Sequence, residues 1–116
     1  MNIGTDIEEI SRFESRTLES DREFLERIFS PKELEYCFSN SRPAQHLTAR
    51  FCAKEAVWKA ISRKNKKLLI SDICVKDAPS GKPEIYIKNK KCRDIEISLS
   101  HTKKYAAAIA ITASSR

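Results

Sequence analysis

Four charged residues, Arg50, Lys54, Glu55 and Lys59, lie in the segment ARFCAKEAVWKAI at residues 49–61, where the other residues are almost all apolar or small. A carboxylate can bind a divalent cation and a lysine can face a phosphate, so Glu55 and Lys59 together suit phosphate chemistry with Mg²⁺. Their spacing of four residues also suits a plain ion pair that stabilises a helix by about 0.2–0.5 kcal/mol. The segment alone leaves both interpretations open.

Two other short segments carry residues with suitable chemistry. Asp6, in IGTDIEE, could supply the second carboxylate that Mg²⁺ needs, or could simply cap a helix. The stretch SLSHT, residues 98–102, places hydroxyl groups and His101 at the end of a predicted strand, where His101 could contact an anion or be an ordinary surface residue. Each signal is weak by itself, and only a shared position in the fold would make them one site.

A helical wheel of residues 44–62 predicts a helix packed on two sides. Its apolar and small residues fall on opposite faces: Leu47, Phe51, Trp58 and Ile61 on one, and Ala49, Cys52, Ala53, Ala56 and Ala60 on the other. Glu55 and Lys59 lie on one border between these faces, and Arg50 and Lys54 lie on the other. We therefore expect a helix between two layers, with its charges along the seams.

Three further helices are predicted in the first half of the chain. TDIEEISRF, residues 5–13, starts with Thr5 or Asp6 as cap, and Ile7, Ile10 and Phe13 share its inner side. DREFLERIF, residues 21–29, repeats apolar residues at helical spacing. SPKELEYCF, residues 30–38, carries a capping box with Pro31 at the first helical position, and SNSRPA after it predicts a loop.

The second half changes to the period of strands. Apolar residues alternate with polar or small ones in three stretches: Ile73 and Val75; Ile85 and Ile87; and Ile95, Ile97 and Leu99. AAAIAIT near the end predicts a last strand, PSGKP a turn, and RKNKK at residues 63–67 a solvated basic loop. Helices followed by a meander of strands indicate an α+β fold with helices packed on an antiparallel sheet.

Composition limits the class of protein. With 116 residues, 41% hydrophobic and 33% charged, we expect a single globular domain spanning residues 1–116. No apolar run approaches the roughly 20 residues that cross a bilayer, and MNIGTDIEEI has no features of a secretion signal, so we expect a cytoplasmic protein with no membrane partner. Cys37, Cys52, Cys74 and Cys92 contain no CxxC pair, which favours reduced, buried thiols.

The net charge of +6 predicts an anionic partner: a nucleic acid, an acidic protein or a phosphorylated small molecule. A basic nucleic-acid-binding module is one alternative, with RKNKK against phosphates. Aromatic residues make up only 8%, and most of them lie on predicted core faces, so no stacking platform supports it. We expect no nucleic-acid partner.

Five segments, in order and spacing, resemble the holo-[acyl-carrier-protein] synthases, the small single-domain branch of the 4'-phosphopantetheinyl transferases. They are IGTDIEEISRF, FSPKELEYC, ARFCAKEAVWKAI, SGKPEIYI and SLSHTKKYAAAIAI. The most specific pieces are G-x-D, R-F-x-A-K-E-A-x-x-K-A and S-x-S-H-T, and the resemblance covers nearly the whole chain. It departs at residues 59–69, which contain no glycine where the family commonly has a glycine-rich turn, and at Cys52, where alanine is usual.

The resemblance implies the 4'-phosphopantetheinyl transferase fold and a transferase of fatty acid biosynthesis and lipid metabolism. Such enzymes bind coenzyme A and Mg²⁺, move the 4'-phosphopantetheine arm to a serine of apo acyl carrier protein and release adenosine 3',5'-bisphosphate. By position, the resemblance implies that Asp6 and Glu55 hold Mg²⁺ and that Lys59 lies against the pyrophosphate. Glu55 is also the candidate general base, acting directly or through a water molecule. The remaining coenzyme A positions are Arg50, Ser80, Gly81, Lys82, Pro83, His101 and Thr102.

The resemblance also implies partners. Arg12, Arg16, Phe24 and Arg27 match the surface that receives the acidic carrier protein. Small members usually form homotrimers with the active site at the subunit boundary, and the apolar last strand YAAAIAIT needs such cover. A carrier-binding relative without catalysis is the other alternative, against which the joint presence of the metal and lysine positions argues.

Overall fold

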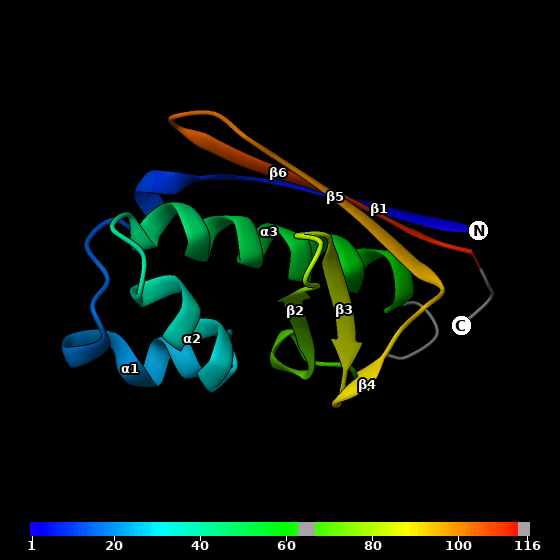
Figure 1. Cartoon of the computed structure of the whole chain (residues 1–116), viewed down its shortest axis with the longest axis horizontal. Coiled ribbons are helices and arrows are strands. Elements are labelled where there is room, and N and C mark those ends of the chain that lie inside the picture. The colour runs from blue at the N-terminus through cyan, green and yellow to red at the C-terminus, as the bar shows by residue number, and fades with distance from the viewer. Residues whose placement is uncertain (63–66, 114–116) are drawn as a thin grey trace.

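The computed structural model describes residues 1–62 and 67–113, and it has the predicted α+β architecture (Figure 1). Its helices are α1 (Leu18–Glu26), α2 (Pro31–Phe38) and α3 (Pro43–Ile61), with 3-10 turns η1 (Ile10–Phe13) and η2 (Ile70–Asp72). Its strands are β1 (Asn2–Glu9), β2 (Ile73–Asp77), β3 (Pro83–Ile87), β4 (Lys90–Lys91), β5 (Ile95–His101) and β6 (Tyr105–Thr112).

Helix α3 lies between two layers, as its two-faced pattern predicts. Strands β1, β6 and β5 form an antiparallel sheet over one side of α3, in that order. Helices α1 and α2 and the small antiparallel sheet β2-β3-β4 lie on the other side (Figure 1). Among the described residues, no helix is long and apolar enough to cross a membrane.

The small-residue face of α3 packs on the larger sheet. Cys52, Ala53, Ala56 and Ala60 of the helix are buried with Ala106, Ala108 and Ala110 of β6. Gly4 of β1 comes closest, since a Cβ atom on it would lie 1.9 Å from the backbone oxygen of Ala56. Strand and helix can therefore approach this closely only with glycine at residue 4.

The apolar face of α3 divides between two clusters. Leu47 and Phe51 pack with residues of the N-terminal helices: Phe13, Leu25, Phe29, Leu34 and Cys37. Ile61 and the half-buried Trp58 pack instead with strands β2 and β3, through residues such as Ile73 and Ile85. All four cysteines are free thiols, as predicted, and Cys74 is the half-buried one among them.

The predicted helix at residues 5–13 is wrong, because Asn2–Glu9 form a strand paired along its length with β6. Acidic residues three positions after Thr5 and Asp6 imitate a capping box, while the alternation of apolar and polar residues through Ile3 and Ile7 is that of a strand. Ile7 is 66% exposed on the outer face of the sheet, so it does not share the buried side of Ile10 and Phe13.

The other elements agree with the prediction to within a few residues. Helix α2 has its capping box, in which Ser30 Oγ accepts from the Glu33 backbone NH and Glu33 Oε1 accepts from that of Ser30. Helix α1 starts earlier than expected, after its cap Thr17, and α3 begins at Pro43, so the preceding loop is shorter than SNSRPA. The predicted basic loop lies mainly in residues 63–66, outside the described residues.

Lys54, which the wheel placed on a border of a mostly packed helix, is 0% exposed. It forms an ion pair with Glu33, whose Oε2 accepts a hydrogen bond of 2.9 Å from the Val75 backbone NH. Burial lowers the pKa of Lys54, and the charge of Glu33 opposes this shift. The pair therefore ties α2, α3 and β2 together inside the core.

We expect Gly4→Ala to destabilise the protein by at least the ~1–3 kcal/mol typical of overpacking, because β1 must move away from α3. Urea unfolding followed by circular dichroism measures the change. Thr5→Ala, on the exposed face of the same strand, is the matched control and should cost less. Equal stability of Gly4→Ala and wild type would contradict the close approach.

We expect Lys54→Met to cost about 3–5 kcal/mol, because it leaves the buried carboxylate of Glu33 without its partner. The double variant Glu33→Gln with Lys54→Met should recover part of this loss in the same unfolding measurement. Lys32→Met, at an exposed position of α2, is the control. If the double variant were as unstable as the sum of the single ones, the ion pair would not be the cause.

Candidate active site

Asp6 lies where strand β1 crosses helix α3, and it faces the helix. Lys59 Nζ lies 3.2 Å from Asp6 Oδ1 and donates a hydrogen bond of 3.0 Å to the Thr5 carbonyl. The side chain of Asp6 is 9% exposed, and its second oxygen, Oδ2, is buried with no hydrogen-bond partner among the described residues. Asp6 is therefore a side chain turned into the molecule, not a helix cap.

Glu55 stands one turn before Lys59 on α3 and is half-buried. Burial raises the pKa of Glu55, the charge of Asp6 raises it further, and the charges of Lys59 and Arg12 lower it. Lys59 forms its ion pair with Asp6 across two elements, and not with Glu55 at the i,i+4 spacing. The structure thus brings Asp6, Glu55 and Lys59 together, as the magnesium interpretation requires.

This donor set fits a magnesium ion. A buried carboxylate oxygen without a partner, beside a second carboxylate, suits a hard cation. Within residues 1–62 and 67–113, no group of three or more His, Cys, Asp and Glu side chains is arranged to hold a metal. Asp6 and Glu55 would therefore supply two ligands, and Mg²⁺ commonly completes its shell with water and phosphate oxygens.

Glu8 is a third carboxylate at this place, which the sequence analysis missed. It shares the inward face of β1 with Asp6, and Arg12 Nη1 lies 2.8 Å from its Oε1. Burial raises the pKa of Glu8, and the adjacent Asp6 carboxyl group adds to the rise. Only the strand assignment would have found it, because residues two apart share a face in a strand and not in a helix.

Arg50 lies in a second group of predicted residues, nearer the start of α3. Its side chain is 8% exposed, its Nη2 is 3.1 Å from Asp77 Oδ2, and its guanidinium stacks on the Tyr36 ring at 4.2 Å. Its Nε is buried without a partner in the described structure. Asp77 pairs with Pro83, so the turn at residues 80–83 begins beside Arg50.

The turn and the β5 end complete this second group. Gly81 has a φ of +89°, which glycine adopts without strain, and its NH donates to the Ala78 carbonyl at 2.8 Å. His101 is exposed at the end of β5, with a ring nitrogen 3.5 Å from Gln45 Nε2. Thr102 follows it, and its Oγ1 accepts from the backbone NH of Tyr105.

His46 joins Arg50 to His101 and was not predicted. Its ring meets that of Tyr36 edge-on, with centroids 5.6 Å apart. Burial lowers the pKa of His46, and the charges of Arg50 and His101 lower it further. The first half of α3 therefore carries basic side chains, while the second half carries Glu55, which faces the carboxylates of β1.

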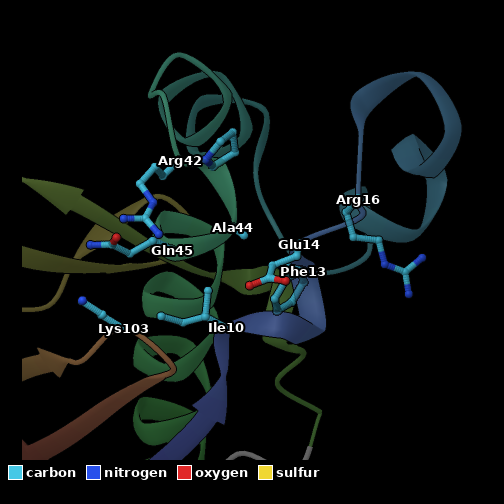
Figure 2. Close-up of a pocket in the computed structure, with 9 residues that line it drawn as sticks. Ile10, Phe13, Glu14, Arg16, Arg42, Ala44, Gln45 and Lys103 are labelled. Atoms are coloured by element: carbon cyan, nitrogen blue, oxygen red, sulfur yellow. The ribbon is translucent and has the colours of Figure 1, made fainter.

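A cavity of about 230 Å³ opens at the N-terminal end of α3 (Figure 2). Arg42, Gln45 and Lys103 gather on one side of it, and Arg16 lies on the other (Figure 2). Three basic side chains beside the first turn of a long helix suit an anion. Neither Arg42 nor Lys103 belongs to a recognisable sequence motif. The cavity forms only where the loop before Tyr105 meets α3, so local sequence does not indicate it.

The four residues expected to dock the carrier protein do not form one group. Arg16 stacks on Phe24 at 4.2 Å and pairs with Asp21 at 3.0 Å, and Arg27 is exposed near Glu23. Arg12 pairs with Glu8 instead, and its guanidinium lies 4.7 Å from the Phe51 ring centroid.

Comparison with known proteins identifies the family of this chain. The family model described as the 4'-phosphopantetheinyl transferase superfamily matches residues 2–110. The holo-[acyl-carrier-protein] synthase of Moorella thermoacetica is 37% identical over 123 residues, covering 99% of this chain and 95% of the relative. That of Thermodesulfovibrio yellowstonii is 40% identical over 111 residues, covering 94% and 95%.

Solved structures show the same fold. The holo-(acyl-carrier-protein) synthase of Bacillus anthracis, in complex with CoA (3',5'-ADP), has a TM-score of 0.76 at 31% identity and covers 98% of this chain and 96% of its own. The Helicobacter pylori synthase, in complex with coenzyme A, has a TM-score of 0.78 at 28% identity, with 96% and 99% covered. On the family match, the near full-length identity and the shared fold, this chain belongs to the holo-[acyl-carrier-protein] synthase family of the 4'-phosphopantetheinyl transferase superfamily.

Proposed function

We propose that this protein transfers the 4'-phosphopantetheine arm of coenzyme A to a serine of apo acyl carrier protein, in a Mg²⁺-dependent reaction that releases adenosine 3',5'-bisphosphate. The observation that carries the proposal is the meeting of Asp6, Glu55 and Lys59, with Asp6 Oδ2 buried and unpartnered among the described residues. Relatives named for this activity, and related structures containing coenzyme A, support it.

Each residue of the carboxylate group has a role in this reaction. Asp6 and Glu55 would hold the magnesium ion, which would supply electrostatic stabilisation of the charge that develops on phosphoryl oxygens. Lys59, held by Asp6 and the Thr5 carbonyl, places its ammonium group against the pyrophosphate. Glu55 accepts the serine proton, directly or through a water molecule.

The basic half of α3 binds the nucleotide end of coenzyme A. Arg50 already pairs with a carboxylate, Asp77, and retains an unpartnered Nε, so a phosphate can share its guanidinium. His101 and Thr102 at the end of β5, and the turn from Ser80 to Pro83, complete the predicted nucleotide contacts. Arg42 and Lys103 of the neighbouring cavity add positive charge on the same side.

The outer face of the β1-β6-β5 sheet is the proposed subunit interface. Ile3, Ile7, Tyr105 and Ile109 are between 39% and 66% exposed on it, and the register pairs Ile3 with Ile111 and Ile7 with Ala107. Three copies joined through this face would bury these residues. His101 and Thr102 border a shallow cavity with Ile7, so they would lie at the subunit boundary.

A single domain over residues 1–116 and a cytoplasmic location stay predictions.

No described contact favours the two alternatives. A nucleic-acid module would need a stacking platform. Among the described residues, the paired aromatic rings are those of Phe13, Phe29 and Phe51, which are core residues, and the Tyr36–His46 pair. An inactive relative would have no need of a buried carboxylate beside a lysine at the family's metal position.

Mass spectrometry of apo carrier protein after incubation with coenzyme A and Mg²⁺ tests the proposal. The proposal requires the mass gain of one phosphopantetheine group.

We expect Glu55→Gln to lower turnover about 100-fold or more, equivalent to about 3 kcal/mol of barrier, because the isosteric amide removes charge from a hard-cation site. Extra Mg²⁺ should restore part of the loss, and unfolding should change little. Glu35→Gln, at an exposed position of α2, is the control. A folded Glu55→Gln variant with normal turnover at low Mg²⁺ would refute the metal assignment.

We expect sedimentation to give a homotrimer at micromolar concentration, and Ile109→Glu to yield monomers with reduced activity. The reason is that Ile109 lies on the central strand of the exposed apolar face, where a carboxylate could not be buried. Leu69→Glu changes an exposed leucine elsewhere and should leave the assembly intact. A fully active wild-type monomer would contradict the proposed interface.

A further inference from the structure

Glu8 is the carboxylate of this region to which the family resemblance gives no role. Its side chain is 17% exposed, and it lies on the inward face of β1 beside Asp6. One of its oxygens is 2.8 Å from Arg12 Nη1, and the neighbouring Asp6 carboxyl group on the same face of β1 helps to raise the pKa of Glu8. Glu8 therefore stands between the metal-binding carboxylates and an arginine.

The charges around Glu8 are unbalanced. Asp6, Glu8 and Glu55 meet two cations, Lys59 and Arg12, each of which contacts one carboxylate. Asp6 Oδ2, nine-tenths buried with its side chain, has no partner among the described residues. The group as a whole therefore favours a further cation, and Glu8 adds to the negative charge that attracts it.

Arg12 reaches from this group toward the surface. Its side chain is half exposed, and its guanidinium lies over the Phe51 ring. Its charge acts on Glu55 as well as on Glu8. While Glu8 holds Arg12, the arginine is directed to the carboxylates and not to an acidic partner protein.

We propose that Glu8 is a positioning residue that couples cation binding to carrier docking, because its carboxylate is shared between the Asp6 side of the site and the Arg12 guanidinium. The inference rests on the proposed function, in which Asp6 and Glu55 hold Mg²⁺, and on the family resemblance, which places Arg12 on the surface that receives the acidic carrier. A divalent cation beside Asp6 attracts Glu8 and repels Arg12, so it releases the arginine for docking. By linkage, docking that removes Arg12 from Glu8 raises the affinity for the cation by the same factor.

The metal arm of the test measures Mn²⁺ affinity by electron paramagnetic resonance of the free ion, with enzyme saturated with coenzyme A and no carrier protein present. Glu8→Gln should weaken Mn²⁺ binding about 5-fold, because a nearby negative charge is lost. Arg12→Gln should strengthen it, because a competing positive charge is lost. Glu9→Gln removes the same charge from the outward face of β1 and should leave the affinity unchanged.

The opposite signs separate this role from a structural one. Glu8→Gln and Arg12→Gln break the same ion pair, so a loss of local order would shift Mn²⁺ affinity in the same direction in both variants. Circular dichroism and sedimentation confirm that fold and assembly are retained. Changes of the same sign, or an affinity of Glu8→Gln equal to that of wild type, would overturn the proposal.

The docking arm measures calorimetric binding of an apo carrier protein whose acceptor serine is replaced by alanine, with and without Mn²⁺. Wild type should bind the carrier about 5-fold more tightly with the cation, and Glu8→Gln less than about 2-fold more tightly. Equal coupling in both proteins would overturn the inference even if native carrier is modified normally. Failure of wild type to bind or modify any apo carrier would instead refute the proposed function, and the metal arm would still decide the cation part of Glu8's role.

Discussion

The close contact between β1 and α3 at Gly4 sets the geometry on which the candidate site depends. The strand lies against the helix backbone at Ala56, with alanines of β6 completing the thin layer between them. Asp6 follows Gly4 by two residues on the same face, while Glu55 and Lys59 flank Ala56 along the helix. A wider separation of strand and helix would move Asp6 away from Glu55, the two carboxylates proposed to bind one cation.

Helix α3 carries its charges for two different reasons. Lys54 and Glu55 are consecutive, so their side chains point about 100° apart. Lys54 turns into the core, where Glu33 compensates its charge, and Glu55 turns to the site beside Asp6. Lys54 therefore stabilises the packing of α3 on its neighbours through an ion pair, and Glu55, the next residue, belongs to the candidate site.

Much of the fold follows from local pattern, and the part that does not is long-range. Ser30, Pro31 and Glu33 act within one turn of helix, so the start of α2 could be predicted. The strand at Asn2–Glu9 depends on pairing with β6, about a hundred residues later, and its local signals favoured a helix. Glu8 and His46 were missed for the same reason. Glu8 comes beside Asp6 only because β1 is a strand, and His46 comes near Arg50 and His101 only because α2 and β5 pack around α3. Among the positions carried over from the family resemblance, Asp6, Glu55 and Lys59 do meet.

The strand order β1-β6-β5 makes the last strand of the sheet its central one. During synthesis β1 emerges about a hundred residues before its hydrogen-bonding partner, Tyr105–Thr112. Such pairing of distant segments slows folding, because a long loop must close before any contact stabilises it. A nascent chain that stalls before Tyr105 would therefore hold Asp6 on an unpaired strand, and Asp6 would not yet be held against Glu55 and Lys59.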